Sequence, residues 1–183
     1  MSAADYEFQT VTAQNWYDLE QLFESRGGPE SCWCMVWRAS PEEAKHNKGS
    51  DRKMCFKKRV DQGIPVGILA YYTGEPVAWC SIAPKTTYRN LTGKAVTSGK
   101  NVWSLVCFFI KRAHRNKGLT HLLTKAAIAY AANNGAEAVE AYPVEADSPS
   151  YRFMGFISTF KELGFTETGR AVTRRHIMIH TLS

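Results

Sequence analysis

The 183-residue sequence lacks any long uninterrupted hydrophobic run. No stretch approaches the roughly 18 apolar residues that a membrane-spanning helix needs, and residues 1–8 have neither the basic nor the apolar region of a secretion signal. Internal repeats, low-complexity tracts and linker-like boundaries are also missing. We therefore expect a single domain over residues 1–183, located in the cytoplasm and without a membrane partner.

Cysteine is scarce and odd in number, with five residues in the chain. A secreted disulfide framework would be denser, and Cys32-x-Cys34 has no second pair with which to complete a zinc site. We expect free thiols and no metal. Two further interpretations of the stretch "CWCMVWR" (Cys32–Arg38) stay open: a redox pair and a covalent cysteine nucleophile.

Positive charge exceeds negative charge, with 23 Lys and Arg against 17 Asp and Glu, for a formal net charge of +6. Such an excess favours an anionic ligand. The basic residues cluster at one turn and do not interleave with aromatic residues, and no nucleic-acid-reading motif occurs. We predict no nucleic-acid partner.

Hydrophobic periodicity predicts a mixed α/β (α+β) fold, in which helices cover both faces of one sheet. A βαβ unit near the middle of the chain requires one parallel strand pair. The predicted strands are 8–11, 66–72, 77–82, 101–110, 138–142 and 174–180. The predicted helices are 12–24, 51–62, 118–134 and 159–163, with a further helix start at 40–43 and a surface loop at 84–100.

The segment Val106–Leu123, "VCFFIKRAHRNKGLTHLL", carries the clearest chemical signal. A buried strand ends in a basic turn, and a helix opens at Gly118. Unpaired N–H groups and the helix dipole make such a helix start a phosphate site. The segment contains neither the Gly-x-Gly-x-x-Gly of a dinucleotide site nor a Walker Gly-Lys-Ser/Thr.

The same turn carries a family resemblance. Arg115–Thr120, "RNKGLT", resembles the Arg/Gln-x-x-Gly-x-Gly/Ala signature of the GNAT superfamily of N-acetyltransferases. The later "FKELGF" (Phe160–Phe165) is similar to that family's aromatic-x-x-x-Gly-Phe ending. The resemblance implies the GNAT fold, with a splayed central strand pair. Within the family, "CWCMVWR" and "VEAYPV" resemble an uncharacterised subgroup.

The resemblance implies acetyl-CoA as the cofactor. Backbone groups at the end of the central strand would pair with the pantetheine arm, and one of their N–H groups, at Phe109 or Ile110, would contact the oxyanion. The following turn would hold the pyrophosphate. The implied cofactor-binding residues are Phe108, Phe109, Ile110, Arg115, Asn116, Lys117, Gly118, Leu119 and Thr120.

The resemblance implies direct transfer of an acetyl group to an amine, which requires a base and an acid. Glu140 is our candidate base, with Ser104 or a water chain behind it. Phe160 occupies the position where the family often has a tyrosine acid, so either Tyr142 or Tyr151 is the acid, or bulk solvent protonates the CoA sulfur. We expect a small-molecule or peptide amine as acceptor, and a catalytically silent acyl-CoA-binding domain is the alternative.

The stretch "CWCMVWR" reads as an extended segment beside the acceptor cleft or as plain core. Alternation along an extended segment would place Trp33 and Trp37 on one face, with Arg38 at the rim of the cleft. The oligomeric state is open between a monomer and a homodimer. The candidate acceptor-binding residues are Trp33, Trp37, Arg38, Trp79 and Trp103.

Overall fold

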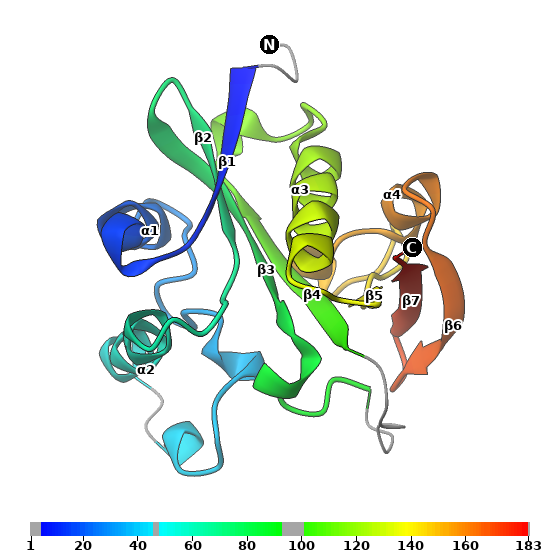
Figure 1. Ribbon diagram of the computed structural model, residues 1–183, viewed down its shortest axis with the longest axis horizontal. Helices are drawn as coiled ribbons and strands as arrows, with labels where there is room; N and C mark the ends of the chain where they lie inside the picture. The colour runs from blue at the N-terminus through cyan, green and yellow to red at the C-terminus, as the bar shows by residue number, and fades with distance from the viewer. Residues whose placement is uncertain (1–4, 46–47, 93–100, 183) are drawn as a thin grey trace.

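A computed structural model describes residues 5–45, 48–92 and 101–182 of the chain. One seven-stranded sheet has the order β1-β2-β3-β4-β5-β7-β6 (Figure 1). Neighbouring strands are antiparallel except β4 and β5, which are parallel. The strands are β1 (Tyr6–Thr10), β2 (Ile68–Tyr72), β3 (Glu75–Pro84), β4 (Val102–Ile110), β5 (Ala138–Ala141), β6 (Thr166–Ala171) and β7 (Arg175–Thr181).

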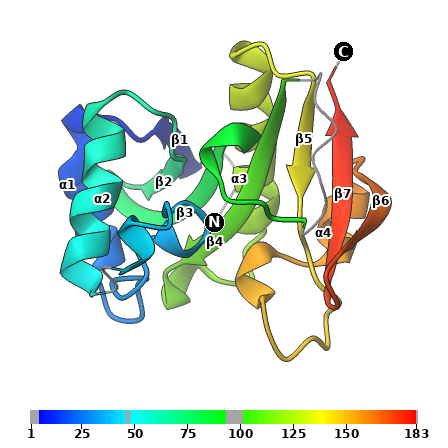
Figure 2. The same cartoon turned by 90° about the horizontal axis from the view of Figure 1, so that it is seen from below.

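Helices cover both faces of the sheet, as the sequence predicts (Figure 2). α1 and α2 lie on one face, and α3 lies on the other. The helices are α1 (Trp16–Phe23), α2 (Gly49–Asp61), α3 (Leu119–Asn133) and α4 (Ile157–Glu162). Single 3-10 turns are η2 (Ala13–Asn15), η3 (Met35–Trp37), η4 (Glu43–Lys45), η5 (Lys85–Thr87), η6 (Arg112–His114) and η7 (Arg152–Met154).

Alternation along β3 explains why the sheet is covered twice. Ala78 and Cys80 pack into the core beneath α3, whereas Trp79 between them packs beneath α1 and α2. Successive side chains of a strand point to opposite faces, so an apolar run such as that of β3 needs a cover on each side. The crossover through α3 supplies one cover and the N-terminal helices supply the other.

A third core cluster lies at the α1 and α2 face of β4 and β5, beneath loops instead of helices. Tyr88 and Leu91, from the segment predicted to be a surface loop, are buried there against Val106 and Tyr142. The described part of that segment therefore packs inward, because burial of its aromatic and apolar side chains against this cluster removes them from water. Residues 93–100 of the predicted loop lie outside the described residues.

Two elements differ from the sequence prediction. β6 was not predicted, because its sequence "TETGRA" is polar and mostly exposed at the edge of the sheet. The predicted helix start at Ser40 yields only the turn η4. Its reciprocal cap is nevertheless present: the Ser40 N–H donates to Glu43 Oε2 at 2.8 Å, and the Glu43 N–H donates to Ser40 Oγ at 3.2 Å.

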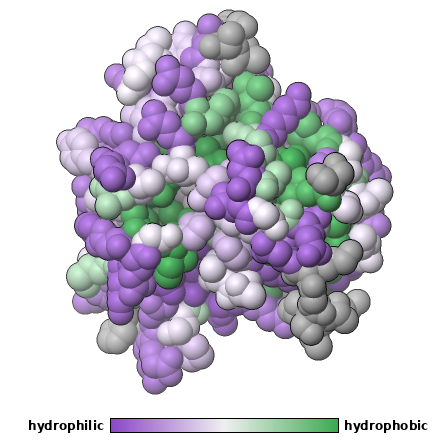
Figure 3. Space-filling view, viewed as in Figure 1, coloured by the Kyte–Doolittle hydropathy of each residue, from purple (hydrophilic) through white to green (hydrophobic). Residues whose placement is uncertain are grey.

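Hydrophobic residues on the surface occur in separate areas among hydrophilic ones, on the face that Figure 3 shows. Large exposed apolar side chains include Tyr17 on α1 and Met54 on α2. Over the described ranges of the chain, none of the helices combines the length and the apolar character that crossing a bilayer requires.

Candidate active site

The parallel pair β4–β5 separates part of the way along β4. The ladder joins Val102 to Ala138 and ends at the pair Leu105–Ala141. β4 continues to Ile110 with β3 on its other side only. A bulge at Val106 marks the point of separation, because Ser81 pairs with Cys107 and the next residue, Ile82, pairs with Leu105. The result is a gap edged by backbone groups that an extended ligand can pair with.

The alternation of backbone hydrogen bonds decides which residues face this gap. The Lys111 N–H donates to Val77 O of β3 at 2.9 Å, and Phe109 pairs with Trp79 of β3. Alternate residues of a strand direct their N–H and C=O groups to opposite sides. The backbone groups of Phe108 and Ile110 are therefore directed toward the gap, and those of Phe109 toward β3.

The turn after β4 leads into the start of α3. Asn116 and Gly118 have positive φ angles of 59° and 73°, which glycine adopts without strain. Leu122 N donates to Gly118 O at 3.2 Å, and Gly118 as N-cap provides no side-chain hydrogen bond. The N–H groups of residues 119–121 precede that first helical bond, so they are available to an anion at the positive end of the helix dipole.

The space in front of this helix start is open. A Cβ atom added to Gly118 would meet no atom within 4 Å apart from those of its chain neighbours. The basic side chains of the turn fold back on its own backbone: Arg115 Nε donates to Ile110 O at 2.9 Å, and Lys117 Nζ donates to Ala113 O at 2.6 Å. An open space, unused amides and nearby positive charge fit a pyrophosphate group.

The three candidate catalytic side chains lie together at the base of the gap. Ser104 of β4 pairs with Glu140 of β5, one rung before the ladder ends. The Tyr142 hydroxyl donates to Glu140 Oε1 and lies 3.3 Å from Ser104 Oγ. All three residues are buried, and Glu140 and Tyr142 lie on the face opposite α3, because the alternate residues Val139 and Ala141 pack beneath α3.

Lys85 completes this cluster, and sequence reasoning missed it. Its Nζ lies 2.7 Å from Glu140 Oε1, so the buried carboxylate has a cationic partner as well as a hydroxyl donor. Lys85 belongs to the turn η5 directly after β3. A lysine in a polar turn carries no sequence signal, because only the packing of η5 over β4 brings it to β5.

The environment of Tyr142 keeps its hydroxyl protonated. Burial, and next the neighbouring carboxylate of Glu140, raise the pKa of Tyr142 far above its usual value. A protonated phenol is a hydrogen-bond donor and a possible acid. Phe160, by contrast, is fully buried against Phe165, with ring centroids 5.0 Å apart, and its side chain has no proton to donate.

The stretch "CWCMVWR" is not extended, which corrects the alternation expected for it. Trp33 and Cys34 both have left-handed backbone angles, with φ of 45° and 51°, and Met35–Trp37 form the turn η3. Trp33 consequently turns inward and stacks on Trp16, with centroids 5.6 Å apart. The segment forms part of the core beneath α1 and α2, and Trp37 is its partly exposed aromatic residue.

Burial also separates the other candidate acceptor residues from solvent. Trp79 is fully buried with Trp33 beneath α1 and α2, and Trp103 is buried against Tyr130 of α3, with centroids 5.2 Å apart. Arg38 does not stand at a rim: it is 4% exposed, and its Nη2 donates to Val66 O, Ser81 Oγ and Tyr88 Oη at 2.6–2.8 Å. These four side chains are components of the interior.

Trp37 is partly exposed and contacts residues from the other half of the chain. Its ring lies 6.3 Å from that of Tyr151, and the Arg175 guanidinium lies 4.8 Å from the Trp37 ring centroid. The Trp37 carbonyl accepts a hydrogen bond of 2.8 Å from the Arg89 N–H. Sequence reasoning did not find Arg175, because a lone arginine at the start of a strand has no distinguishing pattern.

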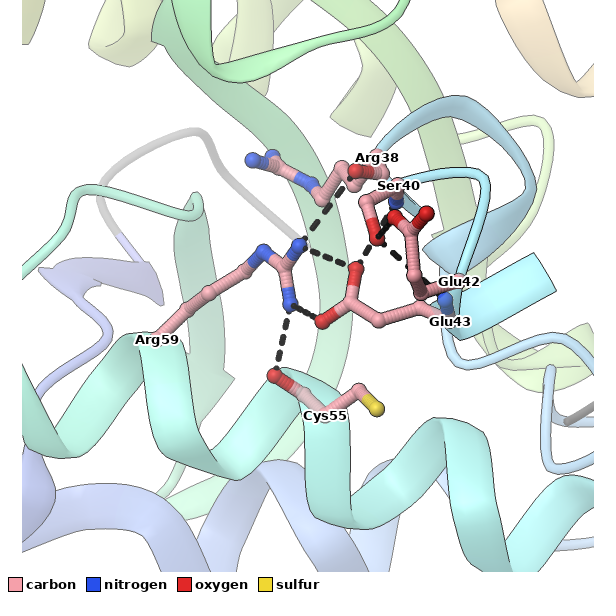
Figure 4. A network of polar contacts seen from close by, with 6 residues as sticks. All are labelled: Arg38, Ser40, Glu42, Glu43, Cys55 and Arg59. Carbon is pink, nitrogen blue, oxygen red and sulfur yellow. Dashed lines mark hydrogen bonds and ion pairs between the residues drawn. The ribbon is translucent and has the colours of Figure 1, made fainter.

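An ion pair anchors the segment that carries Trp37. Arg59 of α2 donates from Nη1 to Glu43 Oε1 at 2.9 Å and from Nη2 to Glu43 Oε2 at 2.7 Å (Figure 4). It also donates to the carbonyls of Cys55 and Arg38. Hydrogen bonding to Arg59 lowers the pKa of Glu43 to about 2. The pair therefore fixes η4, and with it the residues after Trp37, against α2.

Cys34 is buried in this region, and its neighbours Cys32 and Cys107 are half-buried. The adjacent Cys107 thiol, together with burial, holds the pKa of Cys34 well above its usual value. A thiol that stays protonated is a poor nucleophile and a poor metal ligand. Throughout the described ranges, no group of three or more His, Cys, Asp or Glu side chains is arranged to hold a metal ion.

A splayed parallel strand pair, followed by an open helix start with free amides, defines a protein that binds an extended, phosphate-bearing cofactor. Residues 16–156 match the model of the acetyltransferase (GNAT) family. The chain belongs to this family, and acetyl-CoA is its cofactor and acyl donor.

Solved structures of low sequence identity share the fold. An uncharacterized protein from Bacillus halodurans has a TM-score of 0.62 at 13% identity, over 96% of this chain and 83% of that one. Aminoglycoside acetyltransferase AAC(6')-Ib with coenzyme A has a TM-score of 0.61 at 15% identity, over 96% and 94%. PaiA N-acetyltransferase from Thermoplasma acidophilum with coenzyme A has a TM-score of 0.58 at 14% identity, over 100% of both chains. No curated protein matches by sequence.

Proposed function

We propose that this acyltransferase moves the acetyl group directly to a primary amine of a small molecule or peptide, in a ternary complex. The observation that carries the proposal is the position of the Ser104–Glu140–Tyr142 cluster. These residues contact one another at the base of the gap between β4 and β5, so proton-transfer groups lie where the strands separate.

The gap and the turn hold the cofactor in this proposal. The backbone groups of Phe108 and the N–H of Ile110 bind the pantetheine arm as an added strand would, since the Ile110 carbonyl already accepts from Arg115. The amides between Asn116 and Thr120 bind the pyrophosphate. Phe109 contributes its half-buried side chain, since its backbone pairs with β3. When bound, acetyl-CoA supplies a thioester whose carbonyl an amine can attack.

Glu140 and Tyr142 share the movement of protons. Glu140 accepts the proton that the attacking amine must lose, and Tyr142 donates its proton to the departing sulfur. The hydrogen bond from Tyr142 to Glu140 then returns the accepted proton to the phenol oxygen, which leaves both groups as they began. Ser104 and Lys85 orient the pair through the hydroxyl contact and the ion pair.

A catalytically silent acyl-CoA-binding domain is the second candidate function. Two observations favour it: Phe160 occupies the position of a common acid, and Oε1 of Glu140 is already engaged by both Lys85 and Tyr142. Such a domain would bind acetyl-CoA and release no CoA thiol in the presence of amines.

The test is CoA-thiol release from acetyl-CoA with a panel of primary amines and amine-terminated peptides. We expect turnover with at least one amine, and Glu140→Gln and Tyr142→Phe should lower kcat by about 10²–10⁴-fold. Glu137→Gln is the matched control, because Glu137 is an exposed glutamate directly before β5. Acetyl-CoA binding without turnover across the panel would favour the silent domain.

A further inference from the structure

Arg175 lies against two neighbouring aromatic rings, those of Trp37 and Tyr151. Its guanidinium carbon lies 4.8 Å from the ring centroid of Trp37 and 5.3 Å from that of Tyr151. The residue is only 5% exposed. Stacking on aromatic faces is favourable for arginine, and it also fixes the plane of the guanidinium fork.

No carboxylate partners this buried charge within the described part of the chain. Arg175 Nη1 is buried without a hydrogen-bond partner, and no ion pair joins Arg175 to an acidic residue there. An unpaired buried charge is costly, and the half-buried Arg59 has Glu43 as its partner. Arg38 is buried without a carboxylate in the described ranges, but its Nη2 donates three hydrogen bonds. Burial lowers the pKa of Arg175 accordingly.

Arg175 lies on the same face of the sheet as the proton-transfer cluster. Ala141 pairs with Met178, and the His176 N–H donates to Pro143 O at 2.9 Å. Alternation therefore places Arg175 and Ile177 on the face of Tyr142, where Ile177 and Tyr142 share a core cluster. Arg175 is thus the next residue of β7 after Ile177 on the face that Tyr142 occupies.

The aromatic residues around Arg175 connect it to solvent. Tyr151 is 37% exposed and Phe153 is 43% exposed, with ring centroids 6.2 Å apart. The subsite therefore has an unpaired guanidinium nitrogen that lies beneath aromatic walls, and those walls reach solvent through Tyr151 and Phe153.

We propose that the acceptor is an amine that also carries a carboxylate, and that Arg175 binds this carboxylate while the rings of Trp37 and Tyr151 contact the carbon skeleton. The proposal rests on the proposed function, because it places the amine at Glu140 and the carboxylate further along the same face. The planar fork of arginine suits a carboxylate, with two parallel N–H···O bonds. A phosphate could offer similar oxygens, so a phosphorylated amine belongs among the probes.

The experiment compares amines that differ only in the anionic group. The pairs are phenylalanine with 2-phenylethylamine and 6-aminohexanoate with hexylamine, and phosphoethanolamine is the phosphorylated probe. Thiol release gives kcat/KM for each amine, and calorimetry on the CoA-loaded protein gives binding independently of turnover. The variants are Arg175→Met, Arg175→Lys and the control Arg174→Met, in which the adjacent exposed arginine is removed.

The wild type should prefer the carboxylated member of a pair by about ten- to a hundredfold, the range expected for hydrogen bonds to a charged group. Arg175→Met should abolish this preference, Arg175→Lys should retain part of it, and Arg174→Met should retain all of it. Three results would overturn the carboxylate assignment. They are equal kcat/KM values of the wild type for both amines of a pair, an unchanged preference in Arg175→Met, and a preference for phosphoethanolamine alone.

The two proposals fail in different ways. Turnover of amines without any preference for a carboxylate refutes the Arg175 subsite and leaves amine acetylation standing. Arg175-dependent binding of carboxylated amines without turnover refutes amine acetylation and leaves the subsite standing. Unfolding in urea and acetyl-CoA binding by each variant show whether a loss reflects misfolding. Arg175→Lys keeps the test informative if Arg175→Met does not fold.

Discussion

The Nζ atom of Lys85 lies 2.7 Å from Oε1 of Glu140. The two residues come from η5 and β5, and β4 lies between those elements in the sheet. The pair is largely buried, with side chains 19% and 7% exposed. It therefore ties the turn after β3 to the strand on the far side of the splayed edge, and it gives the candidate base a fixed counter-ion.

Lys85→Met should destabilise the fold by about 3 kcal/mol, because it leaves a buried carboxylate without its cation. Glu140→Gln in the same chain should restore a large part of that loss, since no unpaired charge then remains. Urea unfolding of the two single variants and the double variant measures the coupling. Additive losses would show that the two side chains do not interact in solution.

Gly118→Ala should weaken acetyl-CoA binding, because it adds a methyl group beside the amides proposed to hold the pyrophosphate, where the free protein leaves room for it. Gly63→Ala is the matched control: Gly63 has a similar φ of 70° and equally open surroundings after α2. Both variants should lose about 1 kcal/mol of stability from the left-handed backbone. Calorimetry with acetyl-CoA should detect weaker binding in Gly118→Ala alone, and equal binding by both would contradict the phosphate site.

Acid should destabilise the protein through Glu43, whose pKa is lowered from 4.5 to about 2 by its hydrogen bonds to Arg59. A depressed carboxyl pKa contributes stability above pH 4.5 and loses it as the pH falls toward 2. We expect a contribution of about 1–2 kcal/mol at neutral pH, after allowance for partial exposure of the pair. Glu43→Gln should flatten this part of the stability–pH curve, whereas Glu42→Gln should leave it unchanged.

Substitutions of Trp33 and Trp37 should have different effects on stability and on acceptor binding, although the two residues are only four positions apart. Trp33→Ala removes a ring packed against Trp16 and Phe23 and should cost about 3–5 kcal/mol of stability. Trp37→Ala should cost only about 1 kcal/mol and should raise the KM for the acceptor amine. Thermal unfolding and steady-state kinetics separate the two effects. A similar loss of stability in both variants, with no change in KM, would contradict the proposed contact of Trp37 with the acceptor.

Features encoded by adjacent residues could be predicted from the sequence. The strand, basic turn and helix around Gly118 follow from a buried apolar run, a positive-φ glycine and helical spacing within about twenty residues. The contact of Ser104 with Glu140 also follows, once the βαβ unit sets β4 beside β5. These features could be predicted because each one follows from a physical property of residues that are close in the sequence or on adjacent strands.

Features that depend on distant contacts could not be predicted. Trp33 turns inward because two consecutive residues adopt left-handed angles, which no glycine or asparagine signals. β6 is a polar edge strand and lacks hydrophobic alternation. Lys85 and Arg175 acquire their roles from elements that the sheet brings near. Residue type alone did not distinguish them from surface charges.

The segment Lys85–Arg89 joins the two halves of the site. Lys85 holds Glu140 at its first residue, and the Arg89 N–H holds the Trp37 carbonyl at its last. A substitution that moves Trp37 to suit a new acceptor therefore also displaces the anchor of the candidate base. During divergence of this protein from its relatives, acceptor specificity and transfer rate would therefore change together. Compensating substitutions should accumulate in these five residues.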